Sequence, residues 1–462
     1  MLGASEDPGR NEKLLSELTS AYADRNATAI EITLDSVILE ITSCSVKQEA
    51  FGTSSCIEVV FSFLREIMYH PYVEPVINAQ IGSVFSVFPS DETTQIKQRE
   101  LIAKCYWLLV RLCRRDMSKA TANTSNIELI ANYRKSLEII TELSKMHIKH
   151  PDIILPTMWL IMILASDSSE RQFRLAAANT TVLIVKVMVQ HAGDTSIAEM
   201  ACRAARNIAS GDADIVAKFV EDKVCEGIVG ILRVQLGQPP FCKELEGTDV
   251  TVEGIKESEG NDVSVEDLKE SAVIDKDQQT LEATESKSQC GSAAVSEAAL
   301  WAIVNLACED NVSTILGAVG GIDAVVDAMH TFRTAGVALA GTSAIRNMSS
   351  VGTHNYALLA KTTVCEVLVS LLVEHSTDIE LLETGLWAIT NLSCDCVLSD
   401  RLGSLGVPKI MLDFYYRFAT VMHIKSHHIT ISHHCHQLVF KLSVNFTLFI
   451  CMLSFIIIST VE

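Results

Sequence analysis

The segment ALWAIVNLACEDN at residues 299–311 decides the fold, because it returns as GLWAITNLSCDC at residues 385–396. A shorter copy, TSAIRNMSSVG at residues 342–352, lies between them and lacks the tryptophan. The residues that correspond across the copies are Trp301 and Trp387, and Asn305, Asn347 and Asn391. Self-similarity with a period near 43 residues is typical of a stack of helical repeats, in which each unit buries its apolar face only against its neighbours.

Composition supports a helical array and excludes several classes of function. Of 462 residues, 48% are apolar and only 9 are proline, which suits an extended helical core. The formal charge of −20 argues against nucleic acid as a partner, because such binding depends on neutralising phosphates, and it favours basic partners. We find no P-loop, Gly-rich dinucleotide turn, H-E-x-x-H motif or nucleophile elbow, so we expect neither catalysis nor a cofactor.

The N-terminus and the cysteines indicate the compartment. The first residues, MLGASEDPGRNEKLL, have neither the basic start nor the apolar stretch of a signal peptide. We therefore expect a cytoplasmic protein, with the nucleus as a further location. The 14 cysteines include no C-x-x-C pair, so we expect reduced thiols packed as small core residues, without disulfides or zinc.

Periodicity and composition divide the chain into six segments. We predict, in order, a flexible lead-in, degenerate helical repeats, clearer repeats, an acidic disordered insertion, further clear repeats and a tail that does not repeat. Their boundaries are residues 1–29, 30–149, 150–240, 241–290, 291–418 and 419–462. Each unit should hold a short helix, a longer helix and an inner helix that carries the repeated asparagine.

The segment 241–290 interrupts one repeat. It holds 14 acidic residues against five lysines and no arginine, a net charge of −9. Such a composition buries too little apolar surface to offset its ordering entropy, so we predict a disordered loop between the second and third helices of one unit. It would serve as a solvated spacer or as an acidic segment that attracts a basic partner. The spacer is favoured, because charge runs are usually solvated surface.

A glycine turn precedes the second helix, as in GVPKIML at residues 406–412, and the pattern A-L-W-A-I-x-N-L marks the third helix. With the period near 42, these motifs resemble armadillo repeats between residues 150 and 418 outside the insertion, and more weakly between 30 and 150. The resemblance implies an all-α fold, a right-handed α-solenoid whose third helices line a concave groove. It also implies binding of extended peptides or partner proteins and no catalytic role.

The Trp-x-x-x-Asn pairs are similar to the peptide-binding array of importin alpha. Residues four apart stand on one face of a helix, so the asparagine would bond a peptide backbone and the tryptophan would hold a lysine or arginine. The candidate groove residues are Arg203, Asn207, Trp301, Asn305, Arg346, Asn347, Trp387 and Asn391. In the alternative, structural interpretation, the asparagines tie down the backbone of the neighbouring repeat and the tryptophans fill the core.

The sequence also departs from the importin pattern. The neighbouring positions read Trp107/Arg111, Trp159/Ile163, Arg203/Asn207 and Ser343/Asn347, so three adjacent Trp–Asn pairs never occur. The first 50 residues contain few Lys or Arg, which leaves no candidate for a basic importin-beta-binding segment. We therefore predict a non-catalytic protein–protein interaction scaffold. An importin-like binder of basic peptides is the first alternative.

The tail at 419–462 changes composition where the next inner helix is due. Residues Leu442 to Val461 are uncharged and mostly apolar, the length of a membrane span. A tail-anchored membrane adaptor is therefore the second alternative, although an aberrant terminus is favoured because a repeat is interrupted in mid-unit. The histidines around Cys435 have irregular spacing that matches no closed zinc site, so we predict no metal.

Overall fold

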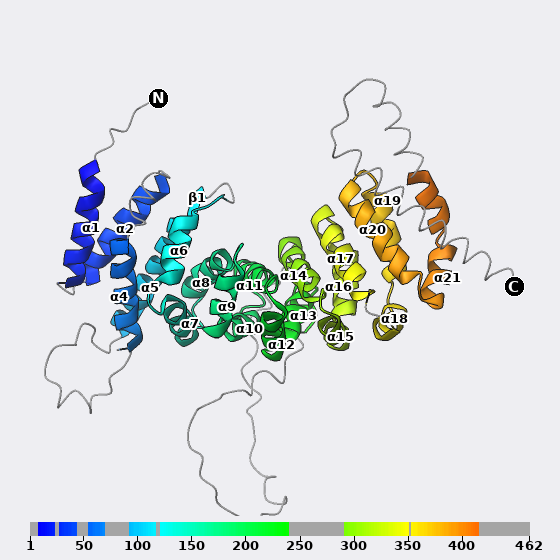
Figure 1. The fold of residues 1–462 in the computed structure, drawn as a ribbon, viewed down its shortest axis with the longest axis horizontal. Coiled ribbons are helices and arrows are strands. Elements are labelled where there is room, and N and C mark those ends of the chain that lie inside the picture. Colours follow the sequence, from blue (N-terminus) through cyan, green and yellow to red (C-terminus); the bar gives the residue numbers. More distant parts are fainter. Residues whose placement is uncertain are drawn as a thin grey trace, which may run out of the picture.

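The computed structural model describes residues 8–23, 27–43, 54–69, 92–116, 121–239, 291–350 and 353–414. They form an elongated array of helices that runs from α1 at one end to α21 at the other (Figure 1). The predictions for the acidic insertion and for the tail, with its histidines and apolar span, lie outside the described residues.

The third helices of successive units form one continuous row. Each packs against the next along the chain, and in Figure 1 they lie side by side from left to right. They are α2 (Ala27–Ser43), α5 (Glu92–Cys113), α8 (Pro151–Leu164), α11 (Thr195–Ile208), α14 (Ala293–Leu306), α17 (Ala335–Met348) and α20 (Ile379–Leu392). This row places the repeated asparagines of the sequence on neighbouring helices.

The second and first helices complete the units and pack behind this row. The second helices are α1 (Pro8–Ala23), α4 (Ser54–Tyr69), α7 (Ser136–Met146), α10 (Thr180–Gln190), α13 (Val224–Gln235), α16 (Gly321–Phe332) and α19 (Val364–Glu374). The first helices are α6 (Thr124–Asn132), α9 (Ser169–Ala177), α12 (Ala213–Glu221), α15 (Asp310–Ala318), α18 (Thr353–Leu359) and α21 (Cys396–Ser404). The predicted fold class, an all-α solenoid of armadillo-like repeats, is confirmed. Its one departure among the described residues is a short antiparallel pair, β1 (Arg114–Asp116) and β2 (Thr121–Ala122).

A left-handed residue separates the first and second helices of most units. Gly320 and Gly406 take this conformation, with φ of +79° and +73°, as the glycine turns in the sequence predict. The same junction is formed by Lys135, Asn179 and Lys223, all with positive φ. A left-handed residue with a side chain costs about 1–2 kcal/mol, so packing of the helix pair holds these turns in place.

The lead-in differs from the sequence prediction, because most of segment 1–29 lies in helices. Helix α1 buries Leu14, Leu18 and Ala21 and packs against α2 and α4. These three residues recur at helical spacing and form a narrow apolar stripe. Their polar surroundings conceal the stripe in the sequence. α1 and α2 are the second and third helices of the first unit.

The insertion leaves its unit intact. Helices α13 and α14, which precede and follow it in the chain, pack against each other as the second and third helices of one unit. The buried amide of Gln235 joins the two ends: its Oε1 accepts from the Ser292 backbone N–H at 2.9 Å, and its Nε2 donates to the Ala192 carbonyl at 3.2 Å. Both ends of the insertion are thereby fixed at one place in the array.

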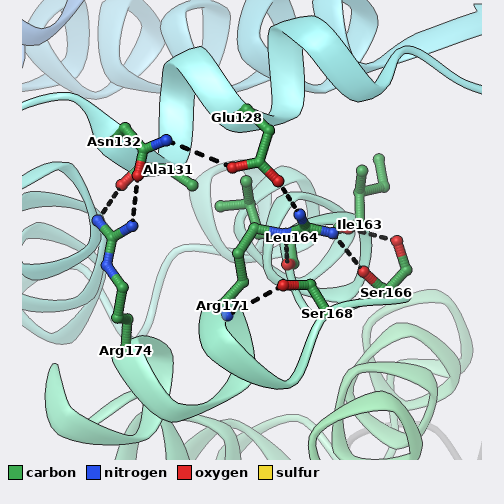
Figure 2. Close-up of polar contacts among 9 residues, drawn as sticks. All are labelled: Glu128, Ala131, Asn132, Ile163, Leu164, Ser166, Ser168, Arg171 and Arg174. Atoms are coloured by element: carbon green, nitrogen blue, oxygen red, sulfur yellow. Dashed lines mark hydrogen bonds and ion pairs between the residues drawn. The ribbon is translucent and has the colours of Figure 1, made fainter.

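Arginines connect the first helices of neighbouring units (Figure 2). Arg171 on α9 donates from Nε to the Leu164 carbonyl at 2.9 Å and from Nη2 to the Ser166 carbonyl at 2.5 Å. Its Nη1 forms an ion pair with Glu128 on α6. The Leu164 carbonyl is the last of α8, where helical partners are lacking, and Ser166 follows the helix. One buried side chain therefore ties together helices from two units.

The part of the chain described by the structure contains no single helix long and apolar enough to cross a membrane. Two pairs, α9 with α10 and α15 with α16, pass such a test only as strongly bent combinations.

Candidate functional site

All eight predicted site residues lie on four consecutive third helices, α11, α14, α17 and α20. We call the side chains that these helices and α8 leave accessible the inner face. The asparagines and tryptophans that are four residues apart do share this face, because each is at least partly accessible while the residues on the opposite side of the helix are buried.

The four asparagines form a ladder across the inner face. Each donates from Nδ2 to a backbone carbonyl of the preceding third helix, always that of the residue just before the corresponding position. The bonds join Asn207 to Met162 at 2.8 Å, Asn305 to Arg206 at 2.8 Å, Asn347 to Val304 at 2.9 Å and Asn391 to Arg346 at 2.9 Å. Each carbonyl lies in the last turn of its helix, where no intrahelical donor follows. The structural role that the sequence left open is therefore present.

Three of the four asparagines keep half of their amide free. The Oδ1 atoms of Asn207, Asn305 and Asn391 accept no hydrogen bond from any described residue, and none is a buried atom without a partner. They are therefore accessible to a ligand. Because an amide oxygen accepts and each nitrogen has a second N–H, these side chains retain the pair of groups that a peptide backbone needs.

Asn347 is the exception, because its amide is already used. Its Oδ1 accepts from Nε and Nη2 of Arg346, both at 3.2 Å. Its Nδ2 lies 3.6 Å from Sγ of Cys308 in addition to its bond with Val304. We call the side chains that each third helix contributes to the inner face a rung. The α17 rung therefore has few free hydrogen-bonding groups for a peptide backbone.

The side chains of the four tryptophans differ in solvent exposure. Trp387 is 40% exposed. Trp301 is only partly exposed, and the guanidinium carbon of Arg206 lies 5.1 Å from the centre of its ring. Trp107 and Trp159 are partly buried and pack against the hydrophobic core. Of the four indoles, Trp387 is the most accessible.

Sequence reasoning missed Arg206 and a set of glutamates on the inner face. Arg206 precedes Asn207 just as Arg346 precedes Asn347, so the repeated Arg-Asn pair was a usable signal. A glutamate also stands four residues before the tryptophan position in three helices. These glutamates are Glu199, Glu297 and Glu383.

The charged residues are paired unequally. Arg203 is bonded to Glu199 at 2.8 Å on the same helix. The Glu297 carboxylate packs closely on Gly336, which places it at the first turn of α17, where helix ends favour negative charge. Although Arg206 is exposed, partial desolvation of its guanidinium and then the charge of nearby Arg203 lower its pKa, and Glu297 opposes this shift.

The inner face offers groups that can bind a ligand. Within the described ranges, no three His, Cys, Asp or Glu side chains are placed to hold a metal ion. Burial raises the pKa of the Cys225 thiol to about 12 and that of Cys202 still further, so these core cysteines stay protonated and unreactive.

Comparisons with known proteins were made by sequence and by structure. No family model and no curated protein sequence matches the chain. A designed armadillo repeat protein in complex with the peptide (KR)4 is similar in structure, with a TM-score of 0.43 and 16% identity over 65% of this chain and 95% of that one. Computationally designed armadillo repeat proteins for modular peptide recognition give 0.41 and 13% over 71% and 98%. An engineered protein gives 0.38 and 14% over 95% and 98%. Likenesses of this degree identify no ligand or partner for this chain.

Proposed function

We propose that this protein is a non-catalytic scaffold that binds an extended segment of a partner protein along its inner face. The observation that carries the proposal is the row of free amide groups on Asn207, Asn305 and Asn391. One N–H of each is fixed by the neighbouring helix, so the remaining groups are held in one orientation before a ligand arrives. Such preorganisation lowers the entropic cost of binding.

The free amides suit a peptide backbone better than a particular side chain. A backbone in extended form presents one N–H and one C=O per residue, and a primary amide complements both. Neighbouring helices pack about 8–10 Å apart, which corresponds to roughly three residues of extended chain at about 3.3 Å each. A peptide that runs across the row would therefore meet an asparagine at regular intervals.

The chain supplies its own control for a test. Asn305→Ala, Asn391→Ala and Asn347→Ala each remove one ladder bond, but only the first two remove a free amide. Peptides selected by the wild-type full chain from a displayed library of random twelve-residue peptides serve as probes. We expect Asn305→Ala and Asn391→Ala to weaken binding about three- to tenfold, as loss of one or two hydrogen bonds predicts. Asn347→Ala should leave affinity within about twofold.

Thermal unfolding of the same variants separates binding from stability, because Asn347→Ala, which also loses the bonds to Arg346, should be destabilised at least as much as the other two. Equal losses of affinity in all three variants would mean that the ladder acts only through stability. Failure to select any peptide would remove the proposed function altogether.

An importin-like preference for basic peptides is a second candidate. The exposed ring of Trp387, one turn from Glu383, favours a cation at the α20 rung. Two features of the neighbouring rungs argue against a continuous basic site. Arg206 covers Trp301, and Ser343, at the tryptophan position of α17, is buried.

We further propose a cytoplasmic or nuclear setting, since the cysteines in the described ranges are free thiols. The membrane-adaptor alternative rests on the tail, outside the described residues.

A further inference from the structure

Arg206 occupies the position that a bound cation would take at the α14 rung. Its guanidinium lies over the Trp301 ring at a distance typical of a cation–π contact. The residue is itself exposed. A lysine or arginine of a partner would have to displace Arg206 to reach this ring and would meet its positive charge in doing so.

The same arrangement leaves a positive charge without a counter-ion. The guanidinium of Arg206 makes no hydrogen bond or ion pair with any described residue. Arg203, one turn earlier on α11 and paired with Glu199 on the same helix at 2.8 Å, adds a second guanidinium near Arg206. Glu297 on α14 acts on Arg206 through its charge without forming an ion pair, and its carboxylate packs against Gly336. Guanidinium groups with unused N–H donors bind carboxylates well.

On α20, the third of the inner helices after α11, the available charge is negative instead of positive. Trp387 is open, and Glu383 stands one turn before it, with no ion pair to any described residue. Arg346 corresponds to Arg206 in the repeat, but its guanidinium donates to the Asn347 amide. The α20 rung therefore presents an accessible ring and a carboxylate, which suit a lysine or arginine.

We propose that the inner face selects a segment of mixed charge, with an acidic side chain at Arg206 and Arg203 and a basic side chain at Trp387 and Glu383. This inference rests on the proposed peptide-binding function and specifies its partner. The two positions are two to three helices apart, or about 20–30 Å at the usual helix spacing. An extended chain covers that distance in about six to nine residues. The partner segment therefore carries one acidic and one basic residue at that separation.

The test uses the full chain and five synthetic peptides that differ at two positions eight residues apart. The pairs of residues are Asp/Lys, Lys/Lys, Asp/Asp and Ser/Ser, and the Asp/Lys pair is made in both chain directions. We expect one direction of Asp/Lys to bind about three- to tenfold more tightly than Lys/Lys, the range for partly exposed charge pairs. Arg206→Glu should reverse this order, and Glu383→Gln should remove the preference for the basic residue alone. Raising the salt concentration should reduce each preference.

The outcomes separate this inference from the function on which it rests. Equal binding of all the peptides overturns the charge assignment and leaves backbone binding in place. Tighter binding of Lys/Lys than of Asp/Lys also overturns it and supports an importin-like site. Binding of none of them overturns both proposals. Because Arg206→Glu must invert the order of two peptides on one protein, general unfolding of the variant cannot imitate the expected result.

Discussion

Arg171, one of the two arginines drawn in Figure 2, gives the sharpest test of how neighbouring units are held together. Arg171→Met keeps much of the side-chain volume and removes the guanidinium. The wild-type side chain is 7% exposed and bonds two carbonyls near the end of α8 as well as Glu128 on α6. We expect the variant to lose these three interactions together.

The loss of folding free energy depends on whether each group that Arg171 bonds can find another partner in the variant. A hydrogen bond to a charged group is worth about 1.5–3 kcal/mol, and breaking a buried ion pair costs about 3–5 kcal/mol. The Glu128 side chain is 46% exposed, so water can solvate it once its partner is gone. The Leu164 and Ser166 carbonyls are less able to find new donors. We therefore expect a loss near the lower end, about 3 kcal/mol.

Arg174→Met on the same helix is the matched control. Arg174 donates to the Asn132 side chain at 2.6 Å and to the Ala131 carbonyl, and it is less buried than Arg171. The same substitution at this site should cost about 1 kcal/mol or less. The two variants share helix, charge change and new residue, so their difference isolates burial and carbonyl bonding.

Urea unfolding gives the global effect, and hydrogen exchange of α6 and α9 gives the local one. Repeat arrays are stabilised by interfaces between neighbours, so the loss should concentrate at these two helices. Arg171→Lys should recover only a small part, since one ammonium cannot replace a planar fork. Equal stability of Arg171→Met and Arg174→Met, within about 0.5 kcal/mol, would refute the reasoning.

Three further predictions concern single positions. Lys223→Gly should raise the free energy of unfolding by up to about 1 kcal/mol, because glycine relieves the left-handed strain at the start of α13; urea unfolding measures it, and Gly320→Ala should do the opposite. Gln235→Ala should lower stability by about 1–3 kcal/mol and speed hydrogen exchange at the ends of the insertion, since two buried backbone groups lose a partner. Burial, followed by nearby His150, lowers the pKa of His147 to about 4, so the unfolded chain binds this proton first and stability should fall as pH drops from about 6.5 to 4. Screening at this partly exposed site limits the change to about 1 kcal/mol, and His147→Gln should remove it.

The fold was predictable because the repeat pattern is local. A period near 43 residues and helical spacing define three-helix units, and every asparagine singled out in the sequence lies on a third helix. The stripe of α1 was missed for the opposite reason. Leu14, Leu18 and Ala21 are three apolar residues among polar ones, which is a weak helical pattern. Their burial becomes evident only from the packing of α1 against α2 and α4.

The roles of individual side chains were less predictable, because their partners are distant in sequence. Asn305 donates to a carbonyl 99 residues earlier, across the insertion. The ring beneath Arg206 lies on the far side of the same insertion. Spacing within one helix shows which face a residue shares. It does not show which neighbour from another unit will use its hydrogen-bonding groups.

The asparagine ladder joins the two roles that the sequence presented as alternatives. A side chain that donates one N–H to the neighbouring helix loses its freedom to rotate, and its remaining groups are then fixed for a ligand. Asn207, Asn305 and Asn391 have this arrangement, whereas the amide of Asn347 is taken up by Arg346 and Cys308. A peptide on this face would therefore be held at α11, α14 and α20 and would pass α17 without a backbone contact. That gap separates the acidic from the basic position of the proposed partner, so the segment between them should tolerate substitution more than the rest.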